Sequence, residues 1–437
     1  MGSCPIAEDE PVVAADKPVV VVDVHALGAD AGHDAEGFLG GSRDPSVLTE
    51  YADHVAISVW NEEDQPELKL SSHGRKVQKF GRPASKVEGL VAVTGLSPLI
   101  ACSIDIGDRG LISAFVERWH RENSSFHLLV GEVSITLDDV ESLLHLPIVG
   151  AFHTFEPLHV DEAVLMLVEL LEVSKEAGHW TTTTRAYVLR LLGYTFFANK
   201  SATHVHCVLL DALGNLCQTG SCAWGAAALV HMYNHLNDAC RSSNRQLAGY
   251  ITLLQHFHLV AECVADPNYD KVSPRACHWI ATKATLKIPN VRWMPYGEHR
   301  PVQEFDLISC FSDQLRWGPV AVRHQPERVM RQFGYVQSIP VEDADSWVSF
   351  EEIDDRWMHY LDHLAPTGEI CLVPGQCVPE YMDWFFVLKP LAAPTHARSD
   401  VDQPRHVVRL LNLRIVTAGT ETHEVMKECI RIARGVT

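Results

Sequence analysis

The chain of 437 residues has no apolar run approaching the roughly 20 residues that a membrane-spanning helix needs. It has no dense cluster of Lys and Arg, and its 36 basic residues face 56 acidic ones, for a formal net charge of −20. Its first residues are acidic, unlike the basic start of a signal peptide. These features exclude a membrane-spanning helix, argue against a surface that wraps nucleic acid, and favour a soluble intracellular protein.

Familiar catalytic signatures are also missing. There is no P-loop, dinucleotide-binding fingerprint or G-x-S-x-G nucleophile elbow, and no lysine whose surroundings suggest a Schiff base with a cofactor. Acidic runs at 138–141 and 351–355 could supply paired carboxylates, but such runs are usually solvated helix faces. Asp138 and Asp139 are also explained as negative charge at a helix N-terminus. We therefore expect a non-enzyme without catalytic residues or cofactors, with an unrecognised hydrolase as an alternative.

The charge is unevenly distributed. The first 70 residues hold 15 acidic and 3 basic residues, a net charge of −12, which leaves −8 for the rest of the chain. We predict a flexible acidic tail over residues 1–43. The closest approach to a basic cluster is Arg405, Arg409 and Arg414 near the end. Direct binding to nucleic acid should therefore be weak.

The 12 cysteines are scattered, which favours reduced, buried thiols over a disulfide scaffold. The best metal candidates are His204, His206, Cys207, Cys217 and Cys222, because imidazole and thiolate groups suit zinc. Their spacing is loose and no second tight pair completes the set, so we expect no metal site.

Two further pairs of side chains have spacings that could form a site. His231 and His235 share one helical face but lack the intervening Glu of a metalloprotease, so we predict a surface pair or a satisfied core pair. Cys371 and Cys377 flank a predicted turn at 373–375 and are expected to be incidental thiols in a loop.

Residues 126–150 carry the densest local signals. Alternating apolar residues on both sides of Gly131 predict a β-hairpin over 126–137. Thr136 followed three residues later by Asp139 indicates a shortened capping box, and apolar residues spaced by three and four predict a helix that Pro147 and Gly150 end.

The rest of the pattern is mainly helical. Apolar spacing predicts helices over 111–120, 160–177, 185–197, 222–237, 246–265 and 348–361, and a last helix over 422–434. Strand patterns are few, at 55–59 and 370–373 besides the hairpin. No fixed-period repeat is present. We predict a mostly α domain with one or two small sheets or hairpins.

The hairpin and short helix, ending in Leu146-Pro147-Ile148, strongly resemble the signature of the plant mobile domain, found in plant MAINTENANCE OF MERISTEMS and MAIN-like proteins and in certain plant transposons. Further blocks resemble the family and occur in its order. Two precede the hairpin, at 44–48 with 59–60 and at 111–119, and the others come after it, at 223–233, 245–250, 293–296 (WMPY), 326–340 and 381–384. The resemblance covers residues 44–390. The predicted architecture is thus an acidic tail over 1–43, one helical plant mobile domain over 44–390, and a linker with an appended helix over 391–437.

The resemblance implies a non-enzymatic protein-interaction module in the nucleus, with roles in transposon silencing, genome integrity and meristem maintenance. The implied partners are proteins, including a plant serine/threonine phosphatase of the type-seven class. A transposon-derived protein with a nucleic-acid-directed role stays open as an alternative. Four tryptophans in these blocks are predicted to anchor the core: Trp119, Trp224, Trp293 and Trp384.

Overall fold

The computed structural model describes residues 53–56, 68–71, 81–101, 109–128, 130–155, 160–171, 180–200, 205–244, 246–249, 251–255, 257, 264–270, 272–280, 291–341 and 348–387. All of them belong to a compact unit that spans residues 37–437. The predicted tail over 1–43 and the predicted helix over 422–434 lie outside the described residues, so both stay predictions.

The described part of the chain is mostly helical, as predicted. Its α-helices are α4 (Ser85–Val93), α5 (Pro98–Ala101), α6 (Arg109–Val116), α7 (Leu137–Leu144), α8 (Val160–Leu171), α9 (Trp180–Tyr194), α10 (Leu209–Ala212), α11 (Leu216–Thr219), α12 (Trp224–Ala239), α13 (Ile251–Gln255), α14 (Phe350–Met358) and α15 (Tyr381–Val387). Short 3-10 helices are η3 (Arg275–His278), η5 (Gly297–His299), η6 (Leu307–Cys310), η7 (Pro326–Phe333) and η8 (Tyr360–His363). None of the helices in these described segments is both long and apolar enough to cross a bilayer.

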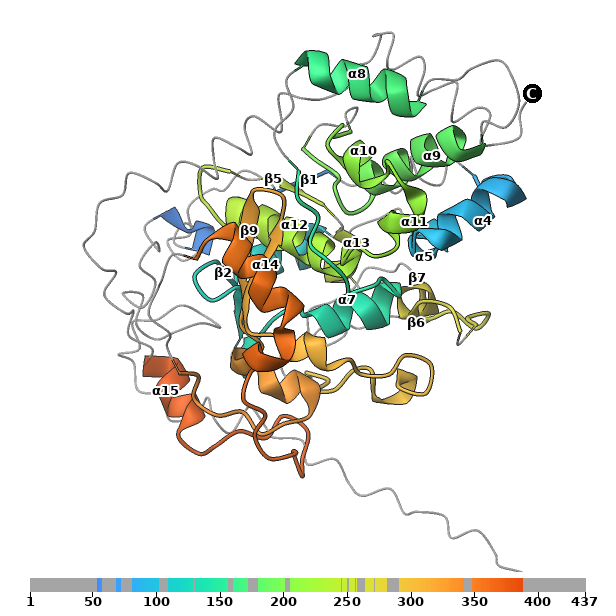
Figure 1. Cartoon of the computed structure of the whole chain (residues 1–437). Helices are drawn as coiled ribbons and strands as arrows, with labels where there is room; N and C mark the ends of the chain where they lie inside the picture. Colours follow the sequence, from blue (N-terminus) through green and yellow to red (C-terminus); the bar gives the residue numbers. More distant parts are fainter. Residues whose placement is uncertain are drawn as a thin grey trace, which may run out of the picture. The chain divides into compact units, whose positions relative to one another are not determined.

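The strands form small separate sheets. β2 (Trp119–His120), β3 (Ser125–Leu128) and β4 (Gly131–Val133) make an antiparallel sheet, and β8 (Asp313–Trp317) pairs with β9 (Val320–His324). β1 (Lys69–Ser71) pairs in parallel with β5 (Gln246–Ala248), and β6 (Val264–Ala265) pairs with β7 (Trp279–Ile280). Helix α12, the longest helix of the described residues, packs against α7, β5, β8 and β9. It therefore connects two of the small sheets with α7 (Figure 1).

The predicted hairpin and capped helix are confirmed. Phe126 lies opposite Val133 and Leu128 opposite Gly131 in an antiparallel register. The Thr136 hydroxyl accepts from Asp139 N at 3.3 Å, and the Asp139 carboxylate accepts from Thr136 N at 2.7 Å, which is the reciprocal pattern of a capping box. These interactions satisfy donors at the start of α7 that have no intrahelical acceptor.

Several predicted boundaries are wrong. The helix expected over 111–120 ends at Val116, and the residues after it form β2, whose buried side chains prolong the apolar pattern. In the described part of 246–265, β5, α13 and β6 replace the expected helix, and Gly249 at φ +97° separates β5 from α13. The predicted strand over 370–373 is only an isolated bridge at Ile370. The described part of the strand expected over 55–59, Val55 and Ala56, is helical.

A buried ion pair joins the hairpin to η7. The guanidinium of Arg328 donates to the Glu132 carboxylate at 2.8 and 3.1 Å, and the Glu132 side chain is fully buried. Nε2 of His127 lies 3.2 Å from the same carboxylate, and the His127 ring stacks on His120 at 3.5 Å. Burial opposes ionisation of Glu132, but Arg328 and His127 outweigh it and hold its pKa below the ordinary value.

A second buried cation lies beside this pair. The Arg331 guanidinium lies between the rings of Trp293 and Tyr381, at 4.3 and 4.9 Å from their centroids, and donates to Val130 O at 2.7 Å. Gly131 has φ +105°, and a Cβ there would lie 2.3 Å from the Arg331 guanidinium. Only glycine therefore fits this position of the hairpin.

The core around α12 relies on one tryptophan and its small neighbours. Trp224 is fully buried, and its indole donates to Thr219 O at 2.8 Å. A Cβ on Gly225 would lie 2.6 Å from Ile148, so the chain approaches α12 closely at this point. The predicted core positions of Trp119 and Trp224 are confirmed, whereas Trp293 and Trp384 are half-buried.

The packing around Trp224 predicts a large effect of its removal. Trp224→Ala should lower the free energy of unfolding by roughly 3–5 kcal/mol, because it removes the indole and leaves a cavity. Denaturant unfolding measures this change. Leu165→Ala on α8, where the leucine is 68% exposed, is the control and should change stability by less than about 0.5 kcal/mol. Equal stability of Trp224→Ala and the parent would contradict the buried position.

The buried pair predicts strong coupling between two distant positions. Glu132→Gln or Arg328→Met alone should cost about 3–5 kcal/mol, since each leaves a buried group without its partner. The double variant should cost clearly less than the sum of the two. Arg82→Met breaks the exposed pair with Glu88 and should leave stability almost unchanged. Strict additivity in the cycle would show that the two side chains do not interact.

Candidate functional site

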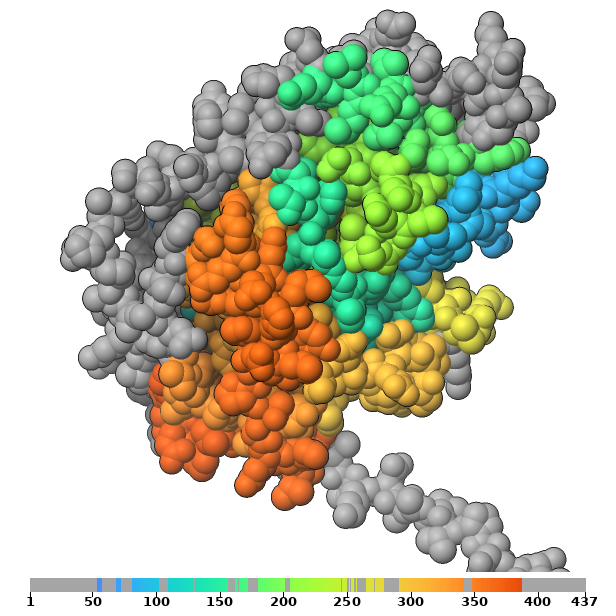
Figure 2. Space-filling view, in the orientation of Figure 1, coloured from blue at the N-terminus to red at the C-terminus, as the bar shows by residue number. Residues whose placement is uncertain are grey.

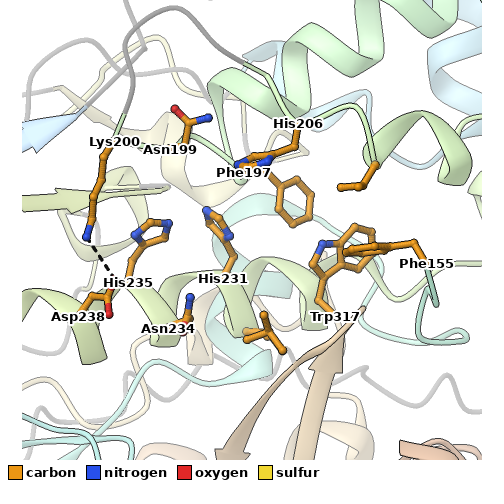
Figure 3. Close-up of a pocket in the computed structure, with 13 residues that line it drawn as sticks. Phe155, Phe197, Asn199, Lys200, His206, His231, Asn234, His235, Asp238 and Trp317 are labelled. Atoms are coloured by element: carbon orange, nitrogen blue, oxygen red, sulfur yellow. Dashed lines mark hydrogen bonds and ion pairs between the residues drawn. The ribbon is translucent and has the colours of Figure 1, made fainter. Parts of the chain in front are cut away.

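A pocket of about 80 Å³ lies beside α12 (Figure 3). Its walls are Phe155, Phe197, Asn199, Lys200, His206, Val208, Val230, His231, Asn234, His235, Asp238, Trp317 and Val320. Helix α12 supplies positions 230, 231, 234, 235 and 238, whose spacing places them on one helical face. The volume is enough for several water molecules or a group the size of a small side chain.

One wall of the pocket is aromatic. Trp317 stacks on Phe197 with ring centroids 4.9 Å apart, and it meets Phe155 edge-on at 5.5 Å. The residue after Trp317 is Gly318 at φ +53°, where a Cβ would lie 2.2 Å from the Phe155 ring. The turn between β8 and β9 therefore needs glycine to keep this wall closely packed.

The other wall is polar. The rings of His231 and His235 lie 4.4 Å apart on α12, and both point toward the pocket (Figure 3). Burial lowers the pKa of His231 well below its ordinary value and that of His235 to about 3. Lys200 Nζ is 3.2 Å from the Asp238 carboxylate, so the two opposite charges neutralise each other.

These groups favour binding over proton transfer. Imidazoles with such low pKa values are neutral near pH 7 and are weak general bases, because an efficient base titrates near the working pH. Neutral imidazole and carboxamide groups beside aromatic rings can hold a small neutral group by hydrogen bonds and stacking. Nδ1 of His235 is buried and has no hydrogen-bond partner within the described part of the chain.

The structure does not assemble the metal candidates taken from the sequence. His206 lines the pocket, Cys207 is buried, Cys217 is exposed, and His204 lies outside the described residues. Burial raises the pKa of the Cys207 thiol to about 11, which disfavours the thiolate that binds zinc. Among the residues that the structure describes, no group of His, Cys, Asp and Glu is arranged to hold a metal ion.

His235 is buried, His231 is half-buried, and both line a pocket, so the predicted surface alternative is wrong. Sequence spacing placed His231 and His235 on one face but gave no sign of the opposing wall. That wall comes from distant segments that include β8 and β9. The turn predicted at 373–375 is present, with Gln376 N donating to Val373 O at 3.1 Å.

The acidic pair at the start of α7 is buried, which corrects its reading as a solvated helix face. Asp138 accepts from the Arg300 guanidinium at 2.7 and 2.6 Å, and Asp139 accepts from the Tyr296 hydroxyl at 2.7 Å. Burial raises the pKa of Asp139 to about 7 against the effect of its hydrogen-bond donors. The sequence predicted that this acidic pair lies at a helix N-terminus, but it did not predict the ion pair between Asp138 and Arg300.

Comparison with known proteins identifies the domain. A family model described as the plant mobile domain matches residues 96–386. The chain belongs to the plant mobile domain family. The resemblance of its sequence blocks is confirmed over that range, and no solved structure matches the chain significantly.

Three curated relatives from Arabidopsis thaliana place this plant mobile domain in different chains. Protein MAIN-LIKE 2 is 26% identical, over 89% of this chain and 68% of the relative. Protein MAINTENANCE OF MERISTEMS is 28% identical, over 78% of this chain and 82% of the relative. Serine/threonine-protein phosphatase 7 long form homolog is 26% identical, over 79% of this chain but only 31% of the relative.

Several plant mobile domain blocks converge on one place in the structure. Glu132 comes from the hairpin block, Arg328 and Arg331 from the block at 326–340, Trp293 from the WMPY block, and Tyr381 from the last block. The sequence blocks carry no sign of these contacts, since Glu132 of the hairpin and Arg328 of η7 are 196 residues apart. The signal in the sequence for a buried ion-pair partner was Glu132, a charged residue among the alternating apolar residues of the hairpin.

The low pKa of His235 predicts how stability depends on pH. The folded state keeps this histidine neutral down to about pH 3, whereas an unfolded chain protonates it near pH 6.5. Its contribution to stability is therefore present above pH 6.5 and is lost as the pH falls toward 3.

His235→Gln removes this contribution. Between pH 6 and pH 4 the free energy of unfolding should fall less steeply in the variant than in the parent, by about 1.4 kcal/mol per pH unit. Urea unfolding at several pH values measures the slope. Asn234→Ala removes a pocket side chain that does not titrate and should leave the slope unchanged. Identical slopes in His235→Gln and the parent would contradict the buried, neutral state.

Proposed function

We propose that this protein is a non-enzymatic interaction module of the plant mobile domain type that acts through partner proteins in the nucleus. The observation that carries the proposal is the distribution of the domain. It covers most of a chain named for meristem maintenance and less than a third of a chain named as a phosphatase. A domain that occurs both largely alone and joined to a much longer chain with an enzyme's name is suited to a binding role.

The partner class follows from the same distribution. Fusion in one chain keeps the plant mobile domain next to the phosphatase part of the molecule. Where the two are separate chains, binding between them would keep them equally close. We propose a serine/threonine phosphatase of the type-seven class as one partner. Transposon silencing, genome integrity and meristem maintenance are the processes proposed for the resulting assembly.

The chemistry of the candidate site supports a binding role. His231 and His235 are neutral near pH 7, and Lys200 and Asp238 are paired with each other. Polar groups in this state can orient a bound group. They are poorly suited to move protons or to attack a substrate.

The charge of the chain supports action through partners rather than on nucleic acid directly. The net charge is −8 beyond residue 70, and phosphate binding depends on clustered Lys and Arg. Any effect on chromatin is therefore proposed to depend on proteins that this chain recruits.

The proposal predicts the result of affinity purification from plant nuclei. The tagged full chain should recover a serine/threonine phosphatase, identified by mass spectrometry, that is missing from a tag-only control. Failure to enrich any protein from nuclei would contradict the interaction role. Tight, salt-sensitive DNA binding by purified protein, either full-length or lacking residues 1–43, would instead favour the transposon-type alternative.

A further inference from the structure

One surface loop presents apolar side chains to solvent. In the segment 369–376, Ile370 is 75% exposed, Leu372 is 91% exposed and Val373 is 58% exposed. Met294, 38% exposed, lies against Gly334, whose carbonyl accepts from Cys371 N at 2.8 Å. We call these four apolar residues the apolar loop patch. Single exposed apolar residues are common, whereas exposed apolar residues that lie together are a feature of interaction sites.

The backbone of this loop is held in place. Val373 to Gln376 form a type II turn, with Pro374 in its second position and Gly375 at φ +80° in its third. Leu372 N donates to the Gln376 side chain at 3.0 Å. The Trp293 indole packs against Gly375 so closely that a Cβ there would lie 2.1 Å from Nε1. A fixed loop loses little conformational freedom when it binds, which favours its use as an interface.

The loop is attached to the rest of the domain at both ends. Val336 N donates to Glu369 O at 2.8 Å, and Gln337 N donates to Gln376 O at 3.0 Å. The segment 350–387, drawn in orange to red, is at the surface of the face seen in Figure 2. The apolar loop patch is therefore presented outward by a backbone that the domain fixes.

The chain segment that carries the loop is acidic. Glu369, Glu380 and Asp383 are exposed, and the sequence has no Lys or Arg from residue 357 to residue 387, whereas one exposed cation, Arg292, lies two residues before Met294. The cation beneath the loop, Arg331, is only 3% exposed and donates to Val130 O. A complementary partner surface would thus combine apolar side chains with positive charge.

We propose that the apolar loop patch is a docking site for a segment of a partner protein whose apolar side chains are flanked by Lys or Arg. The inference rests on the proposed interaction function and assigns it a surface. Apolar side chains of the partner cover Leu372 and its neighbours, and the flanking cations lie beside Glu369, Glu380 or Asp383.

The same charges disfavour other occupants. A two-fold contact between two copies would bring identical acidic rims together, and like charges across an interface cost free energy. An anionic membrane surface would also be repelled by these carboxylates. A basic and apolar segment is the partner chemistry that satisfies both parts of the surface.

The test selects a phage library of random 12-residue peptides on the full chain. Enriched peptides should combine apolar residues with Lys or Arg, and fluorescence anisotropy should show at least tenfold weaker binding to Leu372→Ser. The matched control is Leu165→Ser, which changes another exposed leucine, on α8 and 68% exposed, and should bind like the parent. Because Leu372 is 91% exposed, its replacement should leave the fold intact, which circular dichroism checks.

Charge complementarity has its own variant. Glu369→Lys with Glu380→Lys should weaken binding of the same peptides, and added salt should weaken binding to the parent. Three results would overturn the docking site: no enrichment, enriched peptides without basic residues, or equal binding by the parent and Leu372→Ser. Self-association of the parent that Leu372→Ser abolishes, measured by sedimentation velocity, would assign the patch to a second copy and also overturn it.

Purification from nuclei separates this inference from the proposed function. If Leu372→Ser recovers the same partners as the parent, the docking site is wrong but the interaction function stands. If neither protein recovers a partner, the interaction function itself fails. Loss of a partner from Leu372→Ser but not from Leu165→Ser supports both.

Discussion

The buried pair of Glu132 and Arg328 is the constraint on which the arrangement of this domain depends. A carboxylate removed from water is tolerated only when a cation and good hydrogen bonds compensate it, so the hairpin and η7 must meet in one register. Gln332 reinforces that register, because its side-chain amide exchanges two hydrogen bonds with the backbone of Ser134 at 2.8 and 2.7 Å. Hydrophobic burial alone would permit several orientations, whereas these directional contacts select one.

Helix α12 connects this region with the pocket. Its Tyr233 hydroxyl contacts Ser134 at 2.9 Å and its ring packs on Trp119 at 5.0 Å, so one face of the helix holds the hairpin. Another face carries His231 and His235 into the pocket. The hairpin, with its buried carboxylate, and the polar wall of the pocket thus pack against the same helix.

The sequence was most informative where the interactions are local. The hairpin and the Thr136–Asp139 capping box could be predicted because their partners lie within a few residues. The partner of Asp138 could not, since Arg300 is 162 residues away and periodicity carries no record of distant residues. The same limit explains the misread strand at 370–373, whose apolar residues face solvent rather than a sheet. Family resemblance placed the blocks correctly in order but gave no contacts between them.

The separation of 196 residues between Glu132 and Arg328 also bears on synthesis at the ribosome. At about 5–20 residues per second, roughly 10–40 s pass between the appearance of the two side chains. During that interval the hairpin cannot bury its carboxylate without cost, and Tyr381, which contacts the hairpin as well, is made later still. The N-terminal half of the domain must therefore wait, partly open, for the C-terminal half to emerge. Nascent chains of this protein are thus exposed to chaperones and proteases for longer than those of a domain built from local contacts.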